Sequence, residues 1–181
     1  MNATATSYET ADQSLTAVLD ALPAGAWSQP SPCEGWTAAD VVAHLIETQR
    51  DFLGQRGVDL GPAPDVAADP AAAWRTHATR VRAALTDDVA ATPYEGFFGP
   101  STVGETFDQF YVWDMVVHRW DVARTAGMDA PFSDEELDRT ERGIEGFGPA
   151  LYMEGSCRDG VEPPVGADRT TRVLARLGRR A

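Results

Sequence analysis

The sequence predicts an all-α protein built as a bundle of helices. Apolar residues recur three and four positions apart along four separate segments, which is the spacing of an amphipathic helix. Stretches rich in proline and glycine separate these segments. The 181 residues are 43% hydrophobic, which is enough to bury one core. Four main helices joined by connections of unequal length indicate a bundle with non-uniform crossovers.

The first three helices are expected at 8–22, 37–54 and 70–85. Pro23 follows the first of them. Thr37, with Asp40 three residues later, is typical of a helix start. Asp69 before Pro70 places a capping residue ahead of a proline at the first helical position. We expect an irregular connection between each pair of these helices.

The fourth helix is expected at 101–126 and is the longest, with acidic residues early and Arg124 late, as the helix dipole favours. The segment 93–100 before it is expected to be a loop with one short extended piece. A fifth helix is predicted from a cap at Ser133 to Phe147. Residues 148–168 are expected to wrap the surface before a short last helix at 170–177.

Charge and composition exclude some classes of partner. The chain has 15 Arg and no Lys against 28 acidic residues, a net charge of -13. A protein that binds nucleic acid or an anionic membrane needs a basic face, so neither is expected as a partner. The first residues do not form a secretory signal, and no apolar run is long enough to span a bilayer. We expect a single cytoplasmic domain over 1–181, with Cys33 and Cys157 as thiols that serve as small packing residues.

The fourth helix carries an acid and a histidine inside its apolar stripe. Asp114 and His118 are four residues apart and fall among Val103, Phe107, Phe110, Tyr111 and Val117. A carboxylate taken out of water needs a hydrogen-bond partner, a counter-charge or a metal ion. Residues four apart on a helix stand about 5–6 Å apart at Cβ, which is close enough to share one ion. The alternative is that Asp114 and His118 form a hydrogen-bonded pair that binds no ion.

The second helix offers a further ligand. His44 lies within the face marked by Val41, Leu45, Thr48 and Phe52. Two imidazoles and a carboxylate suit zinc first, with nickel or iron as alternatives, and three protein ligands leave a position open. His77 on the third helix could be a fourth ligand, but no other polar group at ligand spacing accompanies it. We therefore interpret His77 as a packing residue.

Two motifs of this chain resemble a known family. The first runs Ser31-Pro-Cys-Glu-Gly-Trp-Thr37 into Val41-Val-Ala-His44-Leu, and the second is Asp114-Met-Val-Val-His118-Arg-Trp-Asp-Val-Ala123. Together they resemble the DinB-like superfamily, specifically the metal-binding domain of mycothiol-dependent maleylpyruvate isomerases and its small, mostly uncharacterised relatives. The likeness covers nearly the whole chain.

The resemblance implies a DinB-like four-helix bundle, here with additional short helices and a long C-terminal wrap. It also implies a divalent metal held by His44, Asp114 and His118. The isomerase has Glu where this chain has Asp114, which shortens the carboxylate side chain by one methylene. It also carries a further domain for which residues 127–181 are too few, so isomerisation of maleylpyruvate itself is not expected. Trp120 and Asp121 are expected to support the ligands from behind.

Three functions are compatible with this pattern. In the first, the open metal position takes the thiol of a mycothiol-type cofactor and presents it to a small electrophile, as in a transferase or isomerase. Arg75 or Arg119 could then steady an acidic substrate, although Arg119 is better interpreted as a surface charge. The second is a metal- or ligand-binding protein without turnover, and the third is a buried polar pair without an ion. The sequence assigns no catalytic or cofactor-binding residue. Its five tryptophans predict a homodimer.

Overall fold

A computed structural model describes residues 2–153 and 157–180, and these are mainly helical with one two-stranded hairpin. The predicted all-α class is confirmed. The contacts group into two compact units, Met1–Asp129 and Ala130–Ala181, which we describe separately. The prediction of a single domain over 1–181 stays a prediction.

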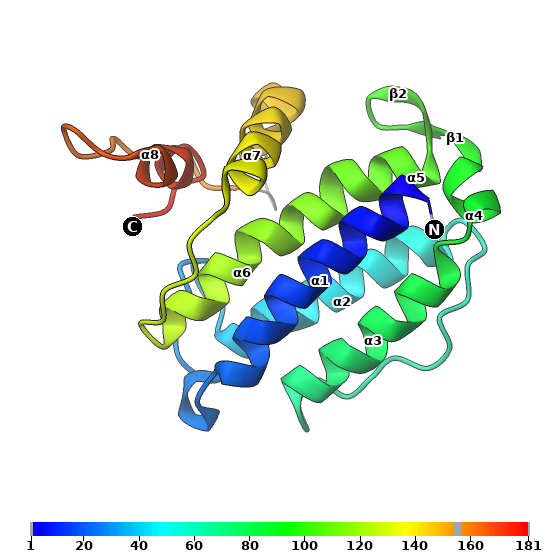
Figure 1. Ribbon diagram of the computed structural model, residues 1–181, viewed down its shortest axis with the longest axis horizontal. Helices are drawn as coiled ribbons and strands as arrows, with labels where there is room; N and C mark the ends of the chain where they lie inside the picture. The colour runs from blue at the N-terminus through cyan, green and yellow to red at the C-terminus, as the bar shows by residue number, and fades with distance from the viewer. Residues whose placement is uncertain (1, 154–156, 181) are drawn as a thin grey trace. The chain divides into compact units, whose positions relative to one another are not determined.

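The first unit is built around four helices that lie side by side (Figure 1). They are α1 (Ala3–Ala21), α2 (Ala38–Gly54), α3 (Pro70–Ala84) and α6 (Trp113–Thr125). Helices α1 and α2 each contact both α3 and α6. Figure 1 shows α2 and α3 running in the same direction, with the connection 55–69 running back along the bundle from the end of α2 to the start of α3. This return is the long crossover that the sequence predicts.

The helix starts follow from local capping chemistry. Thr37 and Asp40 form a reciprocal capping box, in which each side chain accepts a hydrogen bond from the other residue's backbone N–H. The Asp69 side chain accepts from the backbone of Ala72, with Pro70 beginning α3 as predicted. Helix α1 begins earlier than expected because the side chain of Asn2 caps it, accepting from the Ala5 N–H at 2.9 Å.

The predicted helix at 101–126 is one helical run with an irregular middle. It comprises α5 (Val103–Thr106), the π-helical segment η2 (Phe107–Val112) and α6. Thr102 and Glu105 form the capping box at its start. Aromatic side chains crowd the π segment, where the Phe107 ring stacks on that of Tyr111 at 5.2 Å between centroids. Such segments are often found beside functional residues, and this one ends two residues before Asp114.

The remaining elements of the first unit are short. The segment expected to hold one extended piece is a hairpin of β1 (Pro93–Gly96) and β2 (Gly99–Thr102), paired antiparallel. The helix α4 (Asp87–Ala91) and the 3₁₀ turn η1 (Ala24–Ala26) were not expected, because both are too short to show a periodic pattern.

The second unit packs two helices against each other. Helix α7 (Asp134–Phe147) starts at a Ser133 capping box and is followed by the 3₁₀ turn η3 (Gly148–Tyr152), and α8 spans Arg169–Arg176. The Arg169 guanidinium donates to Asp138 at 2.5 Å and to Glu141 at 2.6 Å, which ties α8 to α7. Residues 157–168 form no helix or strand, as predicted for the wrap. Residues 154–156 of that wrap lie outside the described residues.

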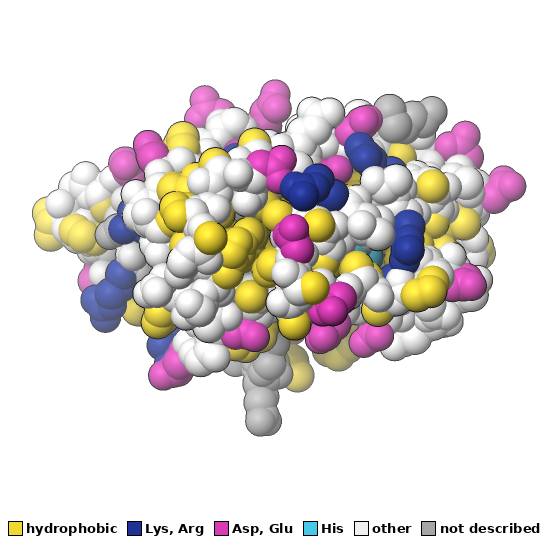
Figure 2. Space-filling view, turned by 90° about the horizontal axis from the view of Figure 1, so that it is seen from below, with side chains coloured by type: hydrophobic (Ala, Val, Ile, Leu, Met, Phe, Trp, Pro, Cys, Tyr) yellow, Lys and Arg dark blue, Asp and Glu magenta, His cyan; other side chains and the backbone are white. Residues whose placement is uncertain are grey.

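The core of the first unit fixes the spacing of its helices. Large side chains from all four helices are fully buried, including Tyr8, Leu15, Leu45, Trp74 and Met115. Acidic side chains are scattered over the face shown in Figure 2 rather than gathered into one patch. No helix in the described part of the chain is long and apolar enough to cross a membrane. The packed α2–α6 pair is the part of this core that positions the candidate site.

Candidate metal centre

His44 and Asp114 meet between α2 and α6. His44 lies in the second turn of α2, which the capping box at Thr37 holds in place. Asp114 lies in the first turn of α6, and its Oδ2 is 3.2 Å from His44 Nε2. The side chains are 27% and 22% exposed, so solvent reaches the site from this side. The sequence placed these two residues on facing helices without specifying their distance.

His118 completes the cluster from one turn further along α6. Its Nε2 lies 3.2 Å from Asp114 Oδ1, so the carboxylate of Asp114 contacts a different imidazole through each oxygen. The His118 side chain is only 7% exposed. The rings of His44 and His118 meet edge to face, with centroids 5.3 Å apart. All three residues predicted as ligands are therefore brought together.

The geometry of this cluster fits a divalent metal ion. One ligand atom from each of His44, Asp114 and His118 can be chosen so that all lie within 4.8 Å of one another. Zinc bonds to nitrogen and oxygen are about 2.0–2.1 Å long, so two ligand atoms of a tetrahedral site stand about 3.3 Å apart. Each imidazole nitrogen is 3.2 Å from one carboxylate oxygen, Oδ2 for His44 and Oδ1 for His118, and each contact by itself is close to this value. Three ligands of this kind leave one position of the ion open.

The charges in the cluster stabilise one another. Burial would raise the pKa of the Asp114 carboxyl, but the imidazoles of His118 and His44 hold that pKa well below its usual range. Burial would likewise lower the pKa of His118, but Asp114 and the hydrogen bond to Asp121 raise it well above the usual value. The Asp114 carboxylate is therefore anionic, and it lies between two imidazoles. Its neighbours favour a positive charge on His118, so a metal ion that binds there takes the place of the Nε2 proton.

A second carboxylate lies behind His118. Asp121 is fully buried, and its Oδ2 is 2.8 Å from His118 Nδ1. A histidine that binds a metal usually donates its other ring N–H to a carboxylate, which orients the ring. Asp121 occupies the position expected of such a partner, in line with the supporting role predicted for it.

The loop before α2 contributes two residues whose positions the sequence did not predict. Cys33, half-buried, donates from Sγ to Asp121 Oδ2 at 3.4 Å and lies 3.8 Å from His118 Nδ1. Cys33, His118 and Asp121 thus form a second group that could hold an ion. The ring of Trp36 packs on His44, with centroids 4.7 Å apart. Both residues belong to the motif 31–37, which was the signal that could have pointed to them. The motif alone does not show where their side chains lie.

His77 lies apart from this cluster, as expected of a packing residue. It is fully buried in α3, and its Nε2 is 3.0 Å from Gln49 Oε1. Burial, aided by the charges of Arg50 and Arg80, lowers the pKa of His77 to about 3. A histidine this hard to protonate is neutral at physiological pH. It is not a member of either candidate ligand group found among the described residues.

The two arginines considered for substrate binding occupy different environments. Arg75 forms an ion pair with Asp20, and both side chains are about half exposed. The interpretation of Arg119 as a surface charge is wrong, because its residue is 9% exposed and ranks among the buried charged residues. A helical wheel places a side chain relative to one helix only, so it cannot show what else covers that face.

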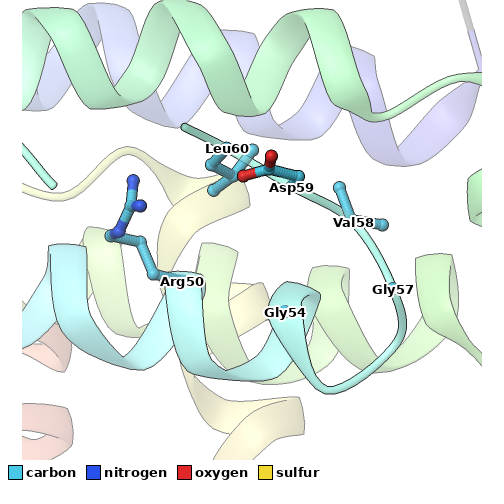
Figure 3. Close-up of a pocket in the computed structure, with 6 residues that line it drawn as sticks. All are labelled: Arg50, Gly54, Gly57, Val58, Asp59 and Leu60. Atoms are coloured by element: carbon cyan, nitrogen blue, oxygen red, sulfur yellow. The ribbon is translucent and has the colours of Figure 1, made fainter. Parts of the chain in front are cut away.

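A surface pocket of about 350 Å³ lies at the other end of α2 (Figure 3). Arg50, Gly54 and the loop 57–60 line it. The Arg50 guanidinium donates to the carbonyl of Gly61, so it is occupied in holding the crossover against the helix. The lining contains no histidine or cysteine. We therefore attribute the pocket to the path of the loop 57–60 after the end of α2, and we assign no function to it.

Four packed helices with a His–Asp–His cluster between two of them define a helical bundle of DinB-like type. The family model described as Mycothiol maleylpyruvate isomerase N-terminal domain matches residues 8–123, and the chain belongs to this family. A search of the curated proteins and a search of the solved structures found no match. The matched range contains the whole of the His44–Asp114–His118 cluster.

Proposed function

We propose that this protein binds one divalent metal ion, with zinc preferred and nickel or iron as alternatives, through His44, Asp114 and His118. The observation that carries the proposal is the pair of 3.2 Å contacts that Asp114 makes, one from each oxygen to a different imidazole. Membership of the family supports it, since the resemblance implies a metal at these positions. If Asp114 and His118 formed only a hydrogen-bonded pair without an ion, the pair would need no carboxylate at the other ring nitrogen of His118. Asp121 occupies that position.

We further propose that the protein uses a low-molecular-weight thiol of the mycothiol type as a cofactor in a transferase or isomerase reaction on a small electrophile. A bound divalent ion supplies a Lewis-acid centre that favours thiolate over thiol at its open position. His44 and Asp114 are the partly exposed members of the cluster, whereas His118 is buried. A thiol would therefore reach the cluster past His44 and Asp114.

The second candidate is a metal- or ligand-binding protein of the same fold without turnover. One observation favours it: Arg75, which was considered for binding an acidic substrate, is half exposed and paired with Asp20 of α1. Metal binding would be the same in the two candidates. Only thiol binding and chemistry would differ.

Isothermal calorimetry with mycothiol separates these candidates. The metal-loaded protein is expected to bind the thiol and release a proton, with affinity increasing as the pH rises toward the thiol pKa of about 8.5. Titration in two buffers of different ionisation enthalpy counts the released protons. The metal-free protein and the His44→Ala variant serve as controls and are expected to bind no thiol. Equal binding to the metal-free protein, or no binding to either form, would leave the non-catalytic candidate.

A further inference from the structure

His118 is held between two carboxylates through its two ring nitrogens. Its Nε2 faces Asp114 at 3.2 Å and its Nδ1 faces Asp121 at 2.8 Å. When an ion replaces the proton on Nε2, the remaining ring proton is on Nδ1, where the shorter contact lets it be donated to Asp121. The orientation of His118 as a ligand therefore depends on Asp121.

Asp121 in turn needs donors, because it is a fully buried carboxylate. One of them is the Cys33 thiol, which donates to Oδ2, the same oxygen that accepts from His118. Two donors on one oxygen fix the carboxylate more narrowly than one donor would. The Cys33 thiol thereby limits the directions in which Asp121 can turn away from His118.

The loop that carries Cys33 is itself closed by hydrogen bonds. The Ser31 N–H donates to the Trp36 carbonyl at 2.8 Å, and the Trp36 N–H donates to the Cys33 carbonyl at 3.1 Å. Gly35 makes the tight turn with φ of +77°, a conformation that favours glycine. The position of Cys33 is thus fixed by the loop and does not rely on contacts of its own side chain.

We propose, resting on the metal site proposed above, that Cys33 is a positioning residue for the metal ligand His118 and acts through Asp121. Its thiol holds the Asp121 carboxylate, which holds the ring of His118 with Nε2 directed to the ion. Cys33 is not itself a ligand in this proposal, because its Sγ lies 3.8 Å from Nδ1 of His118, the nitrogen that already faces Asp121. Trp36 of the same loop packs on His44. One loop therefore contacts both the ligand His44 and Asp121, the partner of the ligand His118.

Metal affinity measured by competition with a chromophoric chelator tests this proposal. Cys33→Ala is expected to weaken zinc binding about fivefold, the size of one intramolecular hydrogen bond. Cys33→Ser should restore most of the affinity, because a hydroxyl can also donate to Asp121. In an Asp121→Ala background, Cys33→Ala should have no further effect, since the thiol acts only through that carboxylate. The matched control is Cys157→Ala, which alters the other thiol and should leave the affinity unchanged.

Two kinds of result would overturn the proposal. The first is unchanged affinity in Cys33→Ala, or an equal loss from this substitution with and without Asp121. The second is a sulfur-to-metal absorption band in the cobalt-loaded wild type without added thiol that disappears in Cys33→Ser, because that would make Cys33 a ligand. If the wild-type protein binds no metal at all, the proposed function fails and this inference fails with it. A failure confined to the Cys33 variants leaves the metal site standing.

Discussion

Two buried histidines lie in the same helical bundle and have opposite electrostatic surroundings. His118 on α6 stands between the carboxylates of Asp114 and Asp121, which raise its pKa well above the usual value. His77 on α3 stands beside the amide of Gln49 and near Arg50 and Arg80, and its pKa is lowered to about 3. Burial opposes the charge of both imidazoles, so the neighbouring groups decide the outcome.

This comparison separates a site suited to a cation from a polar group that helps to fill a core. The surroundings of His118 are anionic, and a partly exposed face of the cluster is open to solvent. Gln49 Oε1 instead accepts from the Tyr8 hydroxyl at 3.2 Å and contacts His77 in a fully buried position. The two histidines should therefore respond differently to mutation, to metal and to acid.

Removing a ligand histidine should have the largest effect. His118→Ala or His44→Ala is expected to abolish stoichiometric metal binding while the bundle remains folded, because a three-ligand site rarely survives the loss of one imidazole. Elemental analysis of purified variants measures this, and circular dichroism checks the fold. His77→Ala is the matched control, expected to keep its metal. Full occupancy after either ligand substitution would show that the ligand set is wrong.

Asp121 should matter less than a ligand but more than an ordinary surface acid. Asp121→Ala is expected to lower metal affinity roughly 10–100-fold, as the loss of a carboxylate that orients a ligand histidine does. Chelator competition provides the measurement. Asp138→Asn, an exposed acid on α7, is the control. Affinities that match in the two variants would remove Asp121 from the account of the site.

The pH dependence of the free energy of unfolding should show the lowered pKa of buried His77. Its pKa is about 3 in the folded protein and near 6.5 when unfolded, so the unfolded chain binds more protons between these values and stability falls as the pH drops below 6.5. From pH 7 to pH 5 this single group should remove roughly 2 kcal/mol of the free energy of unfolding. His77→Gln keeps a donor for Gln49 and should remove that loss in urea unfolding curves. If the free energy of unfolding of the variant had the same pH dependence as that of the wild type, a group other than His77 would cause it.

Self-association should have the smallest effect on metal affinity, because the groups that contact His118 and His77 belong to the same chain. We expect a homodimer, based on the large aromatic side chains of the sequence, and expect no change in metal affinity on dilution. Light scattering over a wide concentration range measures the mass. A constant value near 19.5 kDa would mean a monomer and would end this prediction.

Much of the bundle could be predicted because its signals are local. The capping pair Thr37 and Asp40, the Asp69–Pro70 start and the cap at Ser133 each act within one helical turn, and all three are confirmed. The π segment at Phe107–Val112 was missed because it depends on how neighbouring aromatic rings pack. The short helix at Asp87–Ala91 was missed because five residues cannot show a helical period.

The candidate site was predictable where spacing on one helix or a family motif carried the information. Asp114 and His118 are a turn apart on any helix, and the motif around His44 supplied the third group. The roles of Cys33 and Trp36 were hidden, because a loop residue has no periodicity and its contacts lie on another helix. Arg119 was misjudged for a related reason, since its burial cannot be deduced from its own helix.

The metal content of the purified protein tests the central claim most directly. Elemental analysis combined with anomalous scattering from crystals names the ion and the atoms that hold it. We predict one divalent ion per chain, zinc first, bound by His44 Nε2, Asp114 and His118 Nε2. A protein that remains metal-free after incubation with zinc, or an ion held by other side chains, would contradict it.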